Sequence, residues 1–122
     1  MYLIDTNIII YYFNGIQQAR KFLNDHAGNL AISTITVLEA LSFATSDKEL
    51  QTTEAFLKNN FIWLDVSRDV VFESAKIRRT KKTKTPDAII GATALRHQLT
   101  LVTRNDKDFR HLPLVLINPI DG

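Results

Sequence analysis

Cysteine is absent from this sequence of 122 residues, which excludes disulfide bonds and zinc sites built on thiolates. Any metal ion would therefore be held by oxygen or imidazole ligands. Glycine and proline are scarce, at 4 and 3 residues, and we find no linker, internal repeat or low-complexity tract. The length corresponds to about one domain, so we expect a single domain over residues 1–122.

Long hydrophobic runs are also missing. The longest uninterrupted apolar run extends from Ile8 to Phe13, whereas a helix that crosses a bilayer needs about 20 apolar residues. No basic segment precedes this run as it would in an export signal. We therefore expect no membrane span and a cytoplasmic location. Hydrophobic residues at 45% and charged residues at 23% are typical of a globular protein and not of a disordered or fibrous one.

Positive charge is concentrated in one segment, although the net charge is only +2. The segment KIRRTKKTK contains six basic residues and no acidic residue: Lys76, Arg78, Arg79, Lys81, Lys82 and Lys84. Such a segment is either a solvated helix end and loop, or a surface that binds the phosphates of a nucleic acid. The second interpretation gains weight if catalytic residues lie next to it.

Short apolar segments without regular alternation are separated by helical segments along the chain. We predict strands in YLI, NLAIS, FIWLDV, LTLVTRND and LPLVLINP, and helices up to Phe13, in IQQARKFLND, in ITVLEALSFA, from Lys48 to Lys58, in SRDVVFESAKIRR and in TPDAIIGATALRHQ. Ser33 or Thr34 can cap the third helix, whose Val37, Leu38, Leu41 and Phe43 we expect on one side. The pattern predicts a three-layer α/β/α fold around a mostly parallel sheet of four to five strands.

Acidic residues follow these strands or lie in the helices that come next. Asp5 follows the first strand, Glu39 lies about one and a half turns into the helix after the second, and Asp87 is in the first turn of the last helix. Asp106 and Asp108 follow the fourth strand. Ligands of parallel sheets collect beyond the carboxyl ends of the strands, so these separate segments can present carboxylates at one edge.

Each acidic residue also has a purely structural explanation. Asp5 can cap the helix after it, Asp87 favours the positive end of a helix dipole, and the loop acids suit a turn. Glu39 is more informative because its helix is otherwise apolar and no lysine or arginine occurs between Ala31 and Asp47. A buried carboxylate needs a partner, so we expect a distant side chain or a cation beside Glu39.

Carboxylates that converge repel one another unless a divalent cation neutralises them. Mg²⁺ or Mn²⁺ fits an oxygen-only set of ligands and leaves positions for water and a phosphate. These residues therefore predict hydrolysis of phosphodiester bonds assisted by a metal ion. The basic segment, which ends at Lys84 just before Asp87, would then hold the nucleic-acid backbone.

Four stretches in this order, LIDTNIII, the isolated helical Glu39, TPDAIIGATAL and LVTRNDKDF, resemble the PIN domain family, and the small form is similar to the VapC-type toxin ribonucleases. The resemblance implies a parallel α/β/α sheet, Mg²⁺- or Mn²⁺-dependent cleavage of RNA, a homodimer, and inhibition by an antitoxin protein that places a segment in the active-site groove. It implies an acidic centre of Asp5, Glu39 and Asp87, with Asp108 as the fourth acid and Asp106 as an additional candidate.

The resemblance also implies supporting residues around these acids. Thr6 and Thr103 match hydroxyl residues that orient ligands or water, Asn7 can support them, and Asn105 occupies an often polar position. For phosphate contacts we expect the following basic residues: Arg78, Arg79, Lys81, Lys82, Lys84 and Arg104. His26, His97 and His111 lack metal-ligand spacing, so we expect them on the surface or on helix faces. We expect Trp63 in the core and Phe109 as an anchor of its loop.

Several alternatives remain open. A phosphotransfer hydrolase resembles an Asp-x-Asp pattern, whereas DTN places Asn7 at the second acidic position. A receiver-type signalling domain has paired acids after its first strand, where this chain offers only Asp5, although Asp65 follows the third. A PIN-like module that binds RNA or a partner with little catalysis, or a structure-selective nuclease of DNA or RNA, also fits the residues.

Overall fold

A computed structural model describes all residues of the chain, 1–122, and contains one parallel sheet. Its strands are β1 (Tyr2–Ile4), β2 (Leu30–Ser33), β3 (Ile62–Leu64), β4 (Thr100–Val102) and β5 (Leu116–Ile117). The five strands lie in the order β3-β2-β1-β4-β5, and every neighbouring pair is parallel. The predicted sheet is therefore confirmed, with five strands.

Helices connect and cover the strands. They are α1 (Thr6–Phe13), α2 (Gln17–Asp25), α3 (Thr34–Ser42), α4 (Asp47–Asn60), α5 (Arg68–Thr80) and α6 (Thr85–His97), with a 3₁₀ turn, η1, at Asp106–Asp108. Serine side chains accept hydrogen bonds from backbone N–H groups at the starts of α3, α4 and α5, where such groups have no partner within the helix. At α3 this residue is Ser33, which decides between the two predicted caps.

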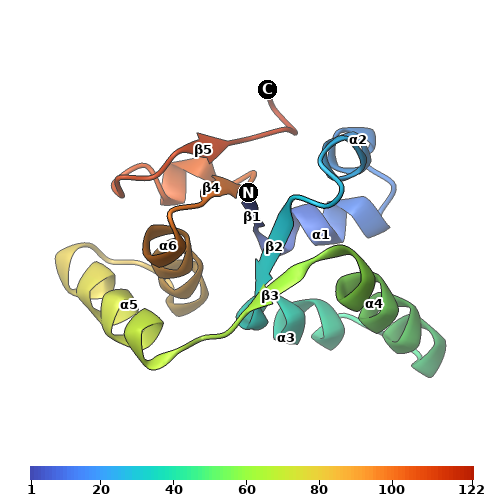
Figure 1. The fold of residues 1–122 in the computed structure, drawn as a ribbon, viewed down its shortest axis with the longest axis horizontal. Helices are drawn as coiled ribbons and strands as arrows, with labels where there is room; N and C mark the ends of the chain where they lie inside the picture. Colours follow the sequence, from blue (N-terminus) through green and yellow to red (C-terminus); the bar gives the residue numbers. More distant parts are fainter.

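The sheet separates two apolar cores. On β1, Leu3 and Ile4 are both fully buried but belong to different cores, because successive side chains of a strand point to opposite faces. Ile4 packs with residues of α1, α2, α3 and α4, whereas Leu3 packs with residues of α6 and with Phe109. A smaller core joins α5 to α6. Figure 1 shows the same arrangement, with α5 and α6 on one side of the sheet and the first four helices on the other.

Two apolar residues in and directly after α3 do not lie where the sequence pattern placed them. Leu38 is 61% exposed and Phe43 is 64% exposed, whereas Val37 is buried. Successive residues of a helix point about 100° apart, so Leu38 turns away when Val37 and Ala40 face the core. The prediction that Val37, Leu38, Leu41 and Phe43 lie on one side is therefore wrong for Leu38 and Phe43.

The predicted positions of single aromatic and histidine residues are only partly confirmed. Phe109 is fully buried beneath the loop after β4, as predicted. Trp63 remains 36% exposed because it lies on the edge strand β3, and its indole N–H donates to the carbonyl of Leu57. Both ring nitrogens of His111 are buried without a hydrogen-bond partner, so the expectation of a surface role is wrong for this histidine.

The strand order places a switch point at the centre of the sheet. The chain builds β1, β2 and β3 outward in one direction and then returns to place β4 on the other side of β1. Connections leave the carboxyl ends of β1 and β4 in opposite directions, and ligands of parallel sheets usually bind at such a point. Asp5 and Thr103 each follow one of these strands. None of the helices has the length and apolar character needed to traverse a lipid bilayer.

Candidate active site

Asp5 lies at the carboxyl end of β1 and is almost completely buried. One carboxylate oxygen, Oδ1, accepts a hydrogen bond of 2.7 Å from the backbone N–H of Thr6, so Asp5 caps α1. The other oxygen, Oδ2, accepts a hydrogen bond of 2.8 Å from the hydroxyl of Thr103 across the switch point. The capping role that the sequence suggested is therefore real, but it uses only one of the two oxygens.

The environment of Asp5 opposes its negative charge. The pKa of its carboxyl group is raised from 3.8 to about 6. Burial is the main cause, and the negative charges of Asp87 and Glu39 act in the same direction, whereas the hydrogen bonds from Thr103 and Thr6 oppose the shift. None of the ion pairs of the structure includes Asp5. A buried carboxylate without a counter-charge is a favourable place for a cation.

Glu39 reaches the same site from α3. Its Oε1 accepts a hydrogen bond of 2.7 Å from the hydroxyl of Thr6, and this hydroxyl also lies 3.0 Å from that of Thr36. The sequence predicted a distant partner for this half-buried carboxylate, and the partner in the structure is a neutral hydroxyl. Thr6 therefore contacts both Asp5 and Glu39, through its backbone N–H and its side chain.

Asp87 lies in the first turn of α6. Partial burial raises the pKa of its carboxyl group, as do the negative charges of Asp108 and Glu39, whereas the positive charge of Lys84 lowers it. Asp108 therefore acts on the site from η1. These mutual effects connect four segments of the chain: the end of β1, α3, α6 and η1.

Asp106 has a different environment from Asp108, although both lie in η1. Its carboxylate forms an ion pair of 2.9 Å with Arg110 and accepts a hydrogen bond from the side chain of Asn118. The hydrogen bond from Arg110 is the main reason why the pKa of Asp106 is lowered. This carboxylate is already neutralised, so between the two candidates only Asp108 contributes unpaired negative charge to the site.

Thr103 organises the segment between β4 and η1. Its hydroxyl donates to Asp5 and accepts hydrogen bonds from the backbone N–H of Asn105 and, at 3.4 Å, from the side chain of Asn7. Asn7 also accepts from the backbone N–H of Arg104. Of the supporting residues, Thr6, Asn7 and Thr103 thus join the acids to the backbone, and Asn105 contributes its N–H group.

The oxygen donors suit a hard cation, but they do not form a closed cage. No group of three or more acidic or histidine side chains lies close enough to hold one metal ion, so the four-carboxylate ligand set expected from the sequence is not formed in this structure. Mg²⁺ is usually bound by one or two carboxylates, with waters and a substrate phosphate completing its coordination.

The basic residues divide into two groups around these acids. Arg78 donates to the carbonyl of Thr83 and holds the connection between α5 and α6, in which Lys81, Lys82 and Lys84 are exposed. This connection leads directly into α6 and Asp87. Arg104, the other predicted phosphate contact, forms an ion pair with Asp121, donates to the hydroxyl of Tyr11 and lies over its ring.

Two neighbours of the site were not found from the sequence. Thr36 is fully buried and contacts Thr6. Its spacing of three residues from Glu39, which puts both on one face of a helix, was the available signal. Asn118 donates to the carbonyl of Arg104 and to Asp106, and thereby fastens the segment before η1. Nothing in the sequence around Asn118 indicates this contact.

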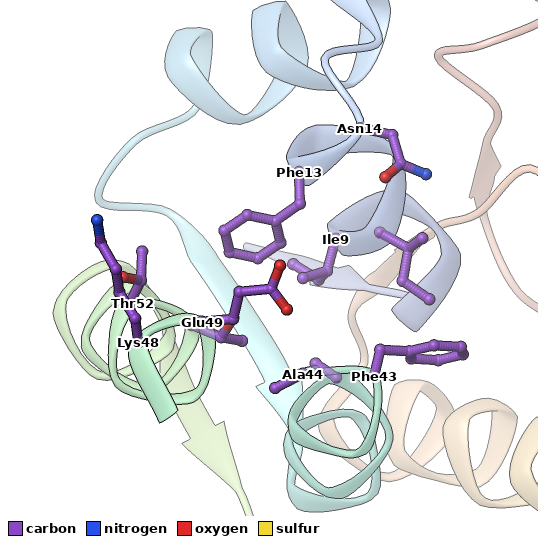
Figure 2. A pocket seen from close by; sticks show the side chains of 11 residues that line it. Ile9, Phe13, Asn14, Phe43, Ala44, Lys48, Glu49 and Thr52 are labelled. Atoms are coloured by element: carbon purple, nitrogen blue, oxygen red, sulfur yellow. The ribbon is translucent and has the colours of Figure 1, made fainter. Parts of the chain in front are cut away.

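An apolar groove with a volume of about 610 Å³ lies between α1, α3 and α4. Ile9 and Phe13 of α1 face Phe43 and Ala44, which directly follow α3, and Lys48, Glu49 and Thr52 of α4 form the polar side of the groove (Figure 2). Ala40, which follows Glu39 directly, also lines the groove. The exposed Phe43 therefore belongs to a concave apolar surface.

Comparison with known proteins identifies the family. The model of the PIN domain family matches residues 2–114. This chain belongs to the PIN domain family. It is similar to "Ribonuclease VapC2" of Rickettsia felis, with 25% identity over 138 residues that cover 99% of this chain and 98% of the relative.

Solved structures agree with this assignment. The chain is 39% identical to one in a toxin–antitoxin complex from Klebsiella pneumoniae, with a TM-score of 0.87 and 98% of both chains covered. It is 26% identical to a chain in the crystal structure of VapBC2 from Rickettsia felis bound to a DNA fragment from their promoter, with a TM-score of 0.80 and coverage of 96% and 97%. The predicted family and fold are confirmed, and this PIN protein is a nuclease that acts on phosphodiester bonds.

Proposed function

We propose that this PIN protein is the toxin of a toxin–antitoxin pair and that it cleaves RNA internally with the help of Mg²⁺ or Mn²⁺. The observation that carries the proposal is the environment of Asp5. Its carboxylate is buried at the switch point of the sheet, is held by two neutral hydrogen bonds, and is repelled by Asp87 and Glu39. RNA as the substrate makes the cytoplasm its place of action.

In this proposal Asp5 and Asp87 hold the cation, while Glu39 and Asp108 complete a negatively charged rim. When bound, the cation would lower the pKa of water and offset the negative charge that develops on the phosphate. Thr103 and Thr6 orient the two oxygens of Asp5, and burial among apolar side chains limits access of bulk water to that carboxylate. The protein thus supplies a preorganised anionic pocket at the edge of the sheet.

The basic residues hold the RNA backbone beside this pocket. Lys81, Lys82 and Lys84 are exposed in the connection that leads into α6, and lysine charges bind phosphates whatever the sequence of the RNA. Arg79 adds charge at the end of α5. Arg78 positions this connection through the carbonyl of Thr83. We assign Arg104 to the same role on the opposite side of the site, where a phosphate would replace Asp121 as its partner.

Cleavage assays test the proposal. Wild-type protein, Asp5→Asn and Asp87→Asn are incubated with a mixed RNA pool and with single-stranded DNA, each with Mg²⁺ or Mn²⁺ and then with a chelator. We expect wild type to cleave RNA only when metal is present. Both variants should lose at least the roughly 10- to 100-fold that is typical when groups around a metal are removed. Asp106→Asn is the matched control and should retain activity, because Arg110 and Asn118 already occupy that carboxylate.

Three other results would contradict the proposal. Equal cleavage by wild type and Asp5→Asn would refute the site. RNA binding without metal-dependent cleavage would show a binding module, and preference for DNA would show a different nuclease.

We further propose that the partner is an antitoxin protein that covers the apolar groove between α1, α3 and α4, and that the toxin is a homodimer. The relatives of known structure are found in toxin–antitoxin complexes, and the groove is lined by Ala40, the residue that follows Glu39 in α3. An apolar segment seated there would bring its flanking residues to the acids. Phe43→Glu should weaken neutralisation by the protein encoded next to this one, whereas Leu38→Glu, a change at an equally exposed residue outside the groove, should not. Light scattering measures the oligomeric state.

A further inference from the structure

Thr36 belongs to none of the acidic or basic groups discussed above, yet its surroundings are unusual for a helical threonine. It is fully buried in α3, three residues before Glu39. Buried hydroxyl side chains in helices commonly donate to a carbonyl of the preceding turn. Thr93 of α6 and Ser74 of α5 do this, each at 2.7 Å. Thr36 makes no such bond, and its only side-chain hydrogen-bond partner is the hydroxyl of Thr6.

The number of protons sets the direction of this contact. A threonine hydroxyl carries one proton and can accept further hydrogen bonds, whereas an ionised carboxylate can only accept. With Glu39 ionised, the proton of Thr6 points to Oε1 of Glu39, 2.7 Å away. Thr6 therefore has no proton left for Thr36, whose oxygen is 3.0 Å away. Thr36 must donate, and the hydrogen bonds run from Thr36 to Thr6 to Glu39.

This chain of donors has a mechanical consequence for the acids. The backbone N–H of Thr6 donates to Asp5 at 2.7 Å while its hydroxyl donates to Glu39. The relative placement of the two carboxylates therefore depends on the side-chain rotamer of Thr6. A hydroxyl that can rotate freely offers a weaker restraint than one whose lone pair is already occupied, because hydrogen bonds in a chain strengthen one another. Thr36 occupies that lone pair.

We propose that Thr36 is a positioning residue that orients Glu39 through the hydroxyl of Thr6 and thereby sets the affinity of the acidic site for a divalent cation. This inference rests on the proposed function, because it assigns Thr36 a part in the cation site of that function. Groups that orient metal ligands without touching the metal typically change its affinity by about 10- to 100-fold. Thr36 acts through one intervening residue, so the effect belongs at the lower end of that range.

The first measurement is Mn²⁺ binding by the protein in the absence of RNA, and calorimetry gives the affinity. Thr36→Val keeps the shape of the side chain and removes the donor, and it should weaken Mn²⁺ binding roughly tenfold. Thr36→Ser keeps the hydroxyl and should return the affinity to the wild-type value. Thr93→Val is the matched control, because Thr93 is equally buried but donates to its own helix. Its Mn²⁺ affinity should equal that of wild type.

The second measurement separates positioning from general packing. Glu39→Gln removes the charge that the chain of donors orients. If Thr36 acts through Glu39, adding Thr36→Val to Glu39→Gln should cause no further loss, whereas two independent effects would add. Thermal unfolding of each variant without metal identifies any loss of folded protein. If Thr36→Val does not fold, Thr36→Ala and Thr36→Ser form a second pair, since both lose the methyl group and only alanine loses the hydroxyl.

The outcomes distinguish this inference from the function on which it rests. If wild type binds Mn²⁺ and Glu39→Gln binds it more weakly, but Thr36→Val matches wild type, the positioning role is refuted and the metal site stands. Equal losses in Thr36→Val and Thr36→Ser would also refute it, because the hydroxyl would then be irrelevant. If wild type neither binds Mn²⁺ nor cleaves RNA, the proposed function fails, and the role of Thr36 fails with it.

Discussion

Replacing Asp5 by asparagine is expected to stabilise the metal-free protein at neutral pH while removing its activity. Folding raises the pKa of this carboxyl group from 3.8 to about 6. A group whose pKa rises on folding opposes folding once it is ionised in both states. A difference of roughly two pKa units corresponds to about 3 kcal/mol. Asparagine carries no charge and avoids this penalty.

The net gain is smaller because the amide has only one oxygen. Asp5 accepts hydrogen bonds from both Thr6 and Thr103, and the NH₂ group of asparagine can accept from neither. Removing one such bond costs about 1 kcal/mol or slightly more. A net stabilisation of about 1–2 kcal/mol remains, which raises the melting temperature of a chain of this size by roughly 4–8 °C.

The dependence on pH provides the decisive assay. The penalty is fully present above about pH 6, where Asp5 is ionised in both states, and it has largely gone near pH 4, where the folded protein has taken up the proton. Thermal unfolding followed by circular dichroism in a chelating buffer should therefore show a higher midpoint for Asp5→Asn at pH 7 and no advantage near pH 4. Equal shifts at both pH values would refute the reasoning. Asp106→Asn should instead lower the midpoint of thermal unfolding at pH 7. Hydrogen bonding lowers the pKa of Asp106, so its charge stabilises the fold.

Three further changes test the architecture and the proposed contacts with RNA. Phe109→Ala removes a fully buried side chain beneath η1 and should lower the free energy of unfolding by about 3–5 kcal/mol in urea denaturation. Ser67→Ala removes the cap that accepts from the N–H of Val70 and should lower it by about 1 kcal/mol in the same assay. Replacing Lys81 and Lys82 together by glutamine should weaken binding of a single-stranded RNA. It should also reduce the slope of log affinity against log salt concentration by about 0.7 for each phosphate that these lysines neutralise in the wild type. An unchanged slope would show that the two lysines bind no phosphate.

Local signals in the sequence were enough for most of the fold. Short apolar runs predict strands of a parallel sheet because such strands are buried on both faces, and serine before an apolar helix predicts its start. The orientation of α3 was harder, because its apolar residues surround much of the helix. Only the neighbours of the folded helix decide that Val37 faces the core while Leu38 and Phe43 do not.

The acidic site was predictable in outline for a similar reason. Asp5 could be assigned because it follows a buried strand, and Glu39 because a carboxylate in an apolar helix requires a partner. The choice between Asp106 and Asp108 was within reach, since Arg110 lies four residues after Asp106 in a favourable position for an ion pair. The contacts of Thr36 and Asn118 join distant segments, so they depend on the packing of the whole chain.

The hydrogen bond between Asp5 and Thr103 links residues that are 98 positions apart in the chain. The ribosome adds the second of them 98 residues after the first. A growing polypeptide therefore cannot form this hydrogen bond until β4 and Thr103 have been synthesised. A polypeptide that terminates before β4 therefore lacks Thr103 and leaves one oxygen of Asp5 without its hydrogen bond.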